Sequence, residues 1–335
     1  MKARENNRAG LNTAAFRSRL LAWYDAHARD LPWRKSRDPY RVWVSEIMLQ
    51  QTRVAAVIEH YHEFLRRFPT VQKLAAAREA SVLAAWSGLG YYRRARMMHA
   101  SAKVIVRERE GKFPGTAAEW RDLPGIGRYT SAAIASIAFG EAIAVVDGNV
   151  ERVLQRIRGA VLSDGEVWDK AEELLDRERP GDFNQAMMEL GATVCTPRAP
   201  ACLTCPVVDL CATRGELPGL AKSPRLNKRD IHYALDDREG KVFLVQRPLD
   251  ASLMAGMWEL PEIEALGNGA KPFCKVKHSI TVTDYTVRVW RKESRNDQPG
   301  QRVAIAKLDR IALTGLARKI LKRVSESVVA EKSAR

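Results

Sequence analysis

One carboxylate stands on the apolar side of a helical pattern near the start of the sequence. Residues 42–54 read VWVSEIMLQQTRV, and helical spacing puts Glu46 on one face with Val42, Trp43 and Leu49. A carboxyl group withdrawn from water has a raised pKa and stays protonated. It can then act as a general acid near neutral pH. The structural alternative is a buried glutamate paired with a nearby arginine.

Two further motifs combine a turn with the start of a helix. LPGIGRYTSAA, residues 123–133, is a Gly-x-Gly turn whose glycines, Gly125 and Gly127, allow close approach of a ligand to the backbone. The free N–H groups of the following helix suit one phosphate of a DNA backbone. An ordinary turn between helices is the alternative. In AIAVVDGNVERVLQRI, Asp147 lies between an apolar run and a helix that it can cap.

Four cysteines form a compact group with metal-binding chemistry. Their spacing is C-x6-C-x2-C-x5-C, in the loop CTPRAPACLTCPVVDLC. Four thiolates this close can hold zinc or an iron–sulfur cluster, and free thiols are the remaining alternative. A set of this kind also favours a reducing, cytoplasmic setting over a secreted disulfide scaffold. The metal ligands are predicted to be Cys195, Cys202, Cys205 and Cys211.

The overall charge is strongly basic. The 335 residues include 55 Lys and Arg against 40 Asp and Glu, a formal charge of +15. This excess favours a polyanionic partner, most simply nucleic acid. No run approaches the roughly 20 apolar residues of a membrane span, and the polar N-terminus carries no apolar signal-peptide core. We therefore expect no membrane association.

The elements that must position these residues are helical in the first two thirds of the sequence. Apolar residues recur at three- and four-residue steps through 14–217, in helical runs that include 42–68 and 71–86, with Gly- and Pro-containing breaks between the runs. A linker follows, and then one helix after several strand-like runs, which include SITVTDYTVRVW at 279–290 and RVAIAKL at 302–308. The sequence predicts an all-α domain over 1–218 with the cysteine loop at 195–211, a linker at 219–228, a smaller α+β domain over 229–325, and a tail at 326–335.

The cysteine spacing, LPGIG with a downstream aspartate, and SEIMLQQTRV together resemble the endonuclease III / MutY family of helix-hairpin-helix DNA glycosylases. The resemblance implies a [4Fe–4S] cluster on the four cysteines. It also implies that Glu46 protonates N7 of a flipped adenine while Asp147 stabilises the sugar cation. Asn149 would hold Asp147 or a water molecule. The expected activity is release of adenine mispaired with 8-oxoguanine or guanine in double-stranded DNA, by a monomer.

The family further nominates residues around the base and the lesion. The adenine pocket is expected to comprise Arg29, Leu31, Trp33, Arg34 and Glu189, with residues 27–43 matching the pocket strand of the family. Contacts to DNA and the lesion are expected from Leu49, Gln51, Tyr91, Gly125, Gly127, Thr281 and His278. Where the endonuclease III branch carries a Schiff-base lysine, this sequence has Tyr129, so no efficient lyase activity is expected. Tyr129 would instead steady the cation or the aspartate.

The C-terminal part resembles the Nudix-like domain of MutY-type enzymes, in the segment KVFLVQRPLDASLMAGMWELPEIE. No glutamate-rich metal-binding helix follows WELP, so we expect no nucleotide hydrolysis. The usual Phe-Ser-His of the lesion-reading loop is replaced by Ile280, Thr281 and Val282, which leaves Thr281 and His278 as the polar groups. Two alternatives stay open: a bifunctional glycosylase/lyase of the endonuclease III type, and a non-catalytic iron–sulfur DNA-binding protein.

Overall fold

The computed structural model describes residues 11–217, 227–265, 271–280, 283–294 and 299–333. The chain forms two compact units. The first comprises 1–54 and 103–221, and the second comprises 55–102 and 222–335. The predicted N-terminal domain is therefore not one compact body, because residues 55–102 group with the C-terminal part of the chain.

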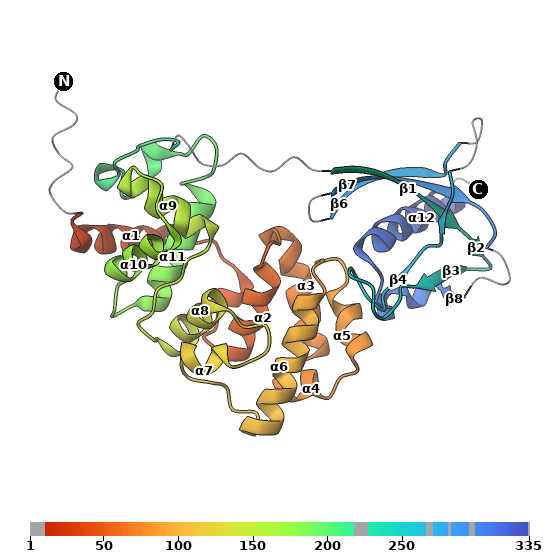
Figure 1. The fold of residues 1–335 in the computed structure, drawn as a ribbon, viewed down its shortest axis with the longest axis horizontal. Coiled ribbons are helices and arrows are strands. Elements are labelled where there is room, and N and C mark those ends of the chain that lie inside the picture. The colour runs from red at the N-terminus through yellow and green to blue at the C-terminus, as the bar shows by residue number, and fades with distance from the viewer. Residues whose placement is uncertain (1–10, 218–226, 266–270, 281–282, 295–298, 334–335) are drawn as a thin grey trace. The chain divides into compact units, whose positions relative to one another are not determined.

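The first unit is built from helices (Figure 1). Its α-helices are α1 (Thr13–His27), α2 (Pro39–Leu49), the second part of α6 (Arg93–Arg109), α7 (Ala117–Arg121), α8 (Arg128–Phe139), α9 (Gly148–Arg158), α10 (Asp164–Leu174) and α11 (Pro180–Thr193). Short 3-10 turns lie at η1 (Pro32–Arg34), η2 (Cys202–Thr204) and η3 (Val208–Leu210). Among the described residues of this unit there is no strand, as the sequence predicts.

Side-chain caps fix where several of these helices begin. Asn12 and Asp38 accept hydrogen bonds from the first turns of α1 and α2. Ser163 and Glu166 form a reciprocal capping box at the start of α10. The apolar faces of α1, α9, α10 and α11 then meet in one core, which contains Phe16, Leu20, Val153, Leu174 and Phe183. Each such side chain contributes roughly 1.5–3 kcal/mol by leaving water.

The Gly-x-Gly turn connects two helices as predicted. It runs from α7 into α8, with Gly125 at φ +75° and Gly127 at the N-cap of α8. No side chain caps α8, so the N–H groups of its first turn receive no side-chain partner at this end. The turn and helix start thus retain the donor arrangement that the sequence indicates for a phosphate.

Three predicted elements differ from the structure. The helical pattern of 42–68 breaks at residues 50–53, between α2 and α3 (Val54–Arg67), where Gln51 has φ +55°. The pattern of 71–86 forms two helices, α4 (Val71–Ala75) and α5 (Glu79–Trp86). The expected pocket strand in 27–43 is wrong: this segment forms the end of α1, the single turn η1 opened by Pro32, and the start of α2.

The second unit joins helices to two sheets (Figure 1). One sheet has the order β5-β1-β7-β6, and in the other β3 lies between β2 and β4 and also pairs with β8. The strands are β1 (Asn227–Leu235), β2 (Asp237–Arg238), β3 (Lys241–Gln246), β4 (Trp258–Glu259), β5 (Glu262–Ile263), β6 (Cys274–Ile280), β7 (Thr283–Arg291) and β8 (Gln301–Ala304). β1 pairs with β7 in parallel, whereas β6 and β7 are antiparallel.

The C-terminal helix α12 (Gly315–Ser333) closes the core of this unit. Leu316, Ile320 and Val324 are buried against apolar side chains of both sheets. The α+β character agrees with the sequence prediction. Two details differ: the run 279–290 is divided between the antiparallel strands β6, which ends at Ile280, and β7, which begins at Thr283, and the run RVAIAKL passes from β8 into the 3-10 helix η4 (Ile305–Arg310). None of the helices in the described ranges has the length and apolar character of a membrane span.

Candidate active site

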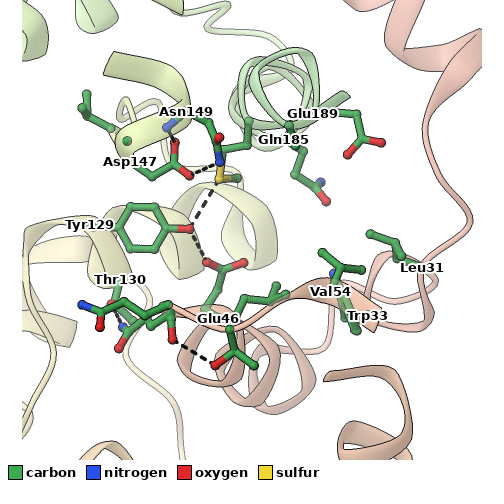
Figure 2. A pocket seen from close by; sticks show the side chains of 18 of the residues that line it. Leu31, Trp33, Glu46, Val54, Tyr129, Thr130, Asp147, Asn149, Gln185 and Glu189 are labelled. Carbon is green, nitrogen blue, oxygen red and sulfur yellow. Dashed lines mark hydrogen bonds between the residues drawn. The ribbon is translucent and has the colours of Figure 1, made fainter. Parts of the chain in front are cut away.

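A cavity of about 700 Å³ opens within the first unit (Figure 2). Its walls come from η1, α2, the start of α8, the start of α9 and α11. Thirteen of the residues nominated from the sequence line it: Arg29, Leu31, Trp33, Arg34, Glu46, Leu49, Gln51, Gly125, Gly127, Tyr129, Asp147, Asn149 and Glu189. Tyr91 and His278 belong to the second unit, and Thr281 lies outside the described residues.

Glu46 is buried at the cavity wall, with 5% of its surface exposed. Desolvation is the main cause that raises its pKa, to about 7, and the negative charge of Asp147 raises it further. The hydroxyl of Tyr129, which donates to Oε2 of Glu46 over 2.8 Å, and the charge of Arg34 act in the opposite direction. The carboxyl group therefore carries its proton in a large fraction of molecules near neutral pH. Its hydrogen-bond partner is a tyrosine rather than the arginine of the structural alternative.

The ring of Tyr129 points between the two carboxylates (Figure 2). Its hydroxyl also lies 3.4 Å from the sulfur of Met188. Burial, together with the charges of Glu46 and Asp147, raises the pKa of this phenol well above its ordinary value, so it remains a neutral donor. The hydroxyl contacts Glu46, whereas the sequence interpretation assigned it to the cation or to Asp147. Met188 was missed, because a methionine at helical spacing is indistinguishable from a core residue.

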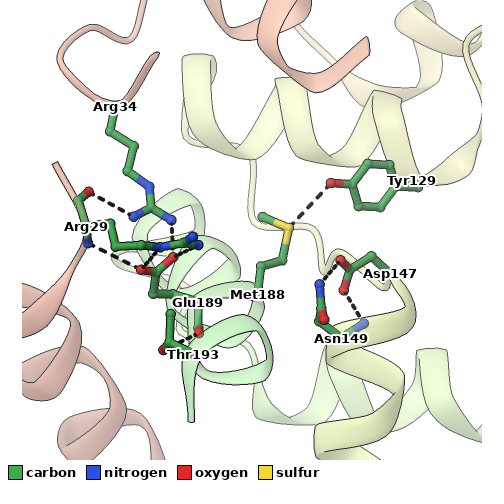
Figure 3. Close-up of polar contacts among 8 residues, drawn as sticks. All are labelled: Arg29, Arg34, Tyr129, Asp147, Asn149, Met188, Glu189 and Thr193. Atoms are coloured by element: carbon green, nitrogen blue, oxygen red, sulfur yellow. Dashed lines mark hydrogen bonds and ion pairs between the residues drawn. The ribbon is translucent and has the colours of Figure 1, made fainter. Parts of the chain in front are cut away.

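Asp147 caps α9 and faces the cavity at the same time. Its Oδ1 accepts from the backbone N–H groups of Asn149 and Val150 at 2.9 and 2.8 Å, and its Oδ2 accepts from Nδ2 of Asn149 at 2.8 Å (Figure 3). Three N–H donors and the N-terminus of α9 together stabilise a negative charge here. The capping role and the chemical role are thus compatible in one side chain.

Asn149 is itself held by an arginine that the sequence reasoning did not single out. The Nη2 of Arg152 donates to Oδ1 of Asn149 at 2.8 Å and to the carbonyl oxygen of Gly191 at 2.7 Å. The Nε of Arg152 donates to the carbonyl oxygen of Cys195 at 2.8 Å. A continuous hydrogen-bonded path therefore joins Asp147 to the first cysteine of the loop. Its only sequence signal is the three-residue spacing of Asn149 and Arg152 on one helix.

Across the cavity, the buried Glu189 forms an ion triad with two partly exposed arginines (Figure 3). Its Oε1 accepts from Nε of Arg29 at 2.6 Å, and its Oε2 accepts from Arg29 at 2.7 Å and from Arg34 at 2.8 Å. Desolvation raises the pKa of Glu189, but the hydrogen bonds and charges of both arginines outweigh it and hold the pKa at about 2. Glu189 is therefore ionised and can only accept hydrogen bonds.

The cysteine loop carries four half-buried thiols. Burial raises the pKa of Cys205 to about 11, and the charges of Cys195, Cys211 and Cys202 add to the rise, which indicates that the four side chains lie within electrostatic reach of one another. Two of the sulfurs already receive N–H donors: Cys195 from Arg156 at 3.3 Å, and Cys211 from the backbone of Arg214 at 3.4 Å. Within the described ranges, no three His, Cys, Asp or Glu side chains are grouped closely enough to hold a metal ion.

Comparison with known proteins agrees with this helical fold. Residues 44–177 match the family described as HhH-GPD superfamily base excision DNA repair protein. A solved thermostable thymine-DNA glycosylase superposes with a TM-score of 0.57 at 31% identity, over 60% of this chain and 96% of that one. These matches define the class, the helix-hairpin-helix DNA glycosylases.

Two named relatives narrow the class. The adenine DNA glycosylase of Mus musculus is 42% identical over 315 residues, which cover 75% of this chain and 61% of the mouse protein. That of Schizosaccharomyces pombe is 33% identical, over 76% of this chain and 70% of the yeast protein. The chain belongs to the adenine DNA glycosylase family. It spans less than two thirds of the length of the mouse relative.

Proposed function

We propose that this protein hydrolyses the N-glycosidic bond of adenine mispaired with 8-oxoguanine or guanine in duplex DNA. The observation that carries the proposal is that Glu46 and Asp147 line one cavity, with a protonated carboxyl group on one side and a carboxylate bound by three N–H donors on the other. Family membership supports adenine as the base. A cavity of about 700 Å³ has room for one flipped nucleoside.

In the proposed mechanism the two carboxyl groups divide the labour. Glu46 gives its proton to N7 of the flipped adenine, so the ring becomes cationic and the electrons of the breaking C1′–N9 bond neutralise it as it leaves. Asp147 stabilises the positive charge that develops on the deoxyribose. A water molecule adds to C1′ and loses a proton, and the products are free adenine and an abasic site.

The ion triad supplies the proposed base selectivity. Adenine presents an exocyclic amine, which donates hydrogen bonds, where guanine presents a carbonyl oxygen, which accepts them. Because the arginines keep Glu189 ionised, its oxygens can accept from adenine but would repel guanine. Leu31 and Trp33, which also line the cavity, offer apolar surface to the base.

Away from the two carboxyl groups, the proposal assigns the Gly125–Gly127 turn to a DNA phosphate, Gln51 and Tyr91 to the mispair, and the C-terminal domain, which we propose is Nudix-like, to the lesion. Both Gln51 and Tyr91 adopt positive φ, at +55° and +47°, a strained conformation that is often retained at functional sites. The formal charge of +15 supports an affinity for DNA that falls steeply with salt. A [4Fe–4S] cluster would be held by Cys195, Cys202, Cys205 and Cys211 and would order the loop; four thiols within electrostatic reach of one another, with N–H donors to two of the sulfurs, support this assignment.

The proposed function is tested with a panel of duplexes. Adenine is placed opposite 8-oxoguanine, guanine or thymine, and the released base and the abasic strand are measured separately. We expect release from the first two duplexes and little from the third. Release of a damaged pyrimidine instead would favour the bifunctional alternative, and absence of any release with tight binding would favour a non-catalytic protein.

The absence of lyase chemistry gives an independent expectation. No covalent enzyme–DNA adduct should form in borohydride during adenine release, because the phenol of Tyr129 cannot form an imine. The measurement is a denaturing gel after reduction. Replacing Tyr129 by lysine provides the positive control, since it restores an amine at this position. A wild-type adduct as strong as that of the lysine variant would contradict the monofunctional assignment.

Positioning of the sugar-side carboxylate can be tested through a glycine. A Cβ at Gly191 would lie 2.6 Å from Cβ and 2.9 Å from the carbonyl oxygen of Asn149, so Gly191→Ala should displace Asn149 and with it Asp147. A shift of about 1 Å at a reacting group costs roughly 100-fold, and we expect a loss of that order in the single-turnover rate of adenine release. Gly165→Ala, whose Cβ meets nothing within 4 Å, is the control and should keep full activity.

A further inference from the structure

The turn that presents Tyr91 has positive φ at several residues, and the strain falls on Tyr91, which is not a glycine. Gly88, Gly90 and Tyr91 have φ values of +111°, +69° and +47°, and a non-glycine residue in this region costs roughly 1–2 kcal/mol. Tyr91 is 47% exposed, so its own burial does not hold the conformation. The surrounding structure must therefore hold it.

Part of that support comes from α6. The guanidinium of Arg94 lies 5.5 Å from the ring centre of Tyr91 and 5.6 Å from that of Trp86, and it donates to the carbonyl oxygens of Leu89 and Gly90 at 3.3 and 3.4 Å. Trp86 also donates to the carbonyl oxygen of Gly90. These contacts, from the end of α5 and the start of α6, hold the middle of the turn.

The two ends of the turn are held from the far end of the sequence. The carbonyl oxygen of Leu313 accepts from Oγ of Ser87 at 2.8 Å and from the hydroxyl of Tyr92 at 3.1 Å. Nε of Arg318 donates to the same Oγ of Ser87 at 2.9 Å. Ser87, Tyr92 and Leu313 are all at least 96% buried. These hydrogen bonds form in the absence of water, where breaking one leaves a costly unpaired group.

The accepting carbonyl is fixed in turn by the sheet. The backbone of Trp258 in β4 donates to Ala312 at 2.8 Å and accepts from Thr314 at 2.9 Å, on either side of Leu313. Arg318 stands on the first turn of α12. The support of the Tyr91 turn thus runs through β4, the segment 312–314 and α12, all of which belong to the second unit.

We propose that the C-terminal segment 312–318 positions Tyr91, with Arg318 and the Leu313 carbonyl group as positioning groups for the residue that enters the mispair. The inference rests on the proposed function, which gives Tyr91 its contact with DNA. It adds a second task to the C-terminal domain: besides facing the lesion, this domain fixes the conformation of the turn that carries Tyr91. A change in α12 then alters mispair binding without touching DNA.

The test is a double-mutant cycle between Arg318→Ala and Tyr91→Ala. Apparent affinity for duplexes with adenine opposite 8-oxoguanine, and the single-turnover rate at saturating protein, are measured for both single variants and the double variant. Arg318→Ala should weaken mispair binding about tenfold in the wild-type background and less than about twofold when Tyr91 is already alanine, because groups that act through one another are not additive. Tyr92→Phe removes the hydroxyl group on Leu313 while keeping the ring, and it should show the same pattern.

Lys322→Ala is the matched control, since it removes an exposed cation from the next turn of α12 and should leave affinity unchanged. An equal loss for Arg318→Ala in both backgrounds would show a role other than positioning Tyr91 and would overturn the inference. A wild-type affinity for Tyr91→Ala alone would instead reject the proposed contact of Tyr91 with the mispair. Absence of adenine release by the wild-type protein would reject the proposed function, so the three failures are distinguishable.

Discussion

Glu46→Gln should lower the single-turnover rate of adenine release by roughly 10²- to 10⁴-fold, the usual contribution of a general acid. The amide keeps the size of the side chain and can still accept the hydrogen bond of Tyr129, but it has no proton to give. Affinity for the mispaired duplex should change little, because binding does not require the proton. The measurement is the rate at saturating protein together with the affinity. A rate within threefold of wild type would remove Glu46 from the mechanism.

The same residue fixes the pH dependence. Burial raises the pKa of Glu46 to about 7, and the protonated form is the active one. Activity should therefore be constant below this value and fall about tenfold per pH unit above it. The Glu46→Gln variant should lack this alkaline limb of the pH–rate profile, and its residual rate should be flat across the same pH range.

Stability distinguishes a lost proton from a damaged fold. The pKa of Glu46 is about 7 in the folded protein against 4.5 for an ordinary glutamate. The free energy that proton binding at Glu46 contributes to folding is therefore fully present below pH 4.5 and is lost as pH rises through about 7. The glutamine side chain does not ionise, so the variant does not lose stability in this way as pH rises. It should be more stable than wild type at pH 8, by up to roughly 3 kcal/mol, and not at pH 4. Denaturant unfolding at both pH values checks this, and a less stable variant at pH 8 would point to misfolding.

The sequence predicts the helices well because their signal is local. Apolar periodicity, caps such as Asn12, and Gly or Pro at the breaks are all read within a few residues. The break after α2 has no such signal. Residues 50–53 contain neither glycine nor proline, and Gln51 adopts a positive φ that only tertiary structure can support. Periodicity alone therefore continued the helix into α3.

For the candidate site, too, one part was predictable from the sequence and another part was not. Glu46 and Asp147 are recognisable because each stands in a short motif, and the cavity brings together thirteen of the nominated residues. What their side chains contact was beyond the sequence. The hydrogen bond from Tyr129 to Glu46 spans 83 residues, and the ion pairs of Glu189 with Arg29 and Arg34 span 160 and 155. Pairings at such separations depend on the packed fold and leave no local pattern.

The division of the chain into compact units shows most clearly what the sequence pattern does not predict. Residues 55–102 have the same helical periodicity as the rest of the N-terminal part, so the sequence gives no reason to separate them. The structure groups them with the C-terminal sheets through contacts such as Ser87 with Leu313, 226 residues apart. The all-α domain expected over 1–218 is therefore continuous in the sequence pattern but does not correspond to one compact unit.

Asp147→Asn should produce the second large loss, roughly 10²- to 10³-fold in the rate of adenine release, because it removes the charge beneath the sugar cation. Asparagine caps helices about as well as aspartate, so α9 should begin at the same residue. Its side-chain oxygen can still accept from the backbone of Asn149 and Val150. The amide group that replaces Oδ2 opposes Nδ2 of Asn149, which costs about 1–3 kcal/mol of stability.

A second measurable effect of Asp147→Asn follows from the electrostatic interaction between the two carboxyl groups. The charge of Asp147 helps to raise the pKa of Glu46, so removing that charge should move the alkaline limb of the rate profile to lower pH. A loss of activity with an unmoved limb would mean that the variant acts only through local disorder. A loss accompanied by the shift requires that the two groups sense each other across one nucleoside-sized space, because like charges raise one another's pKa only at close range. The pH profile of the asparagine variant therefore tests the shared cavity itself as well as the role of Asp147.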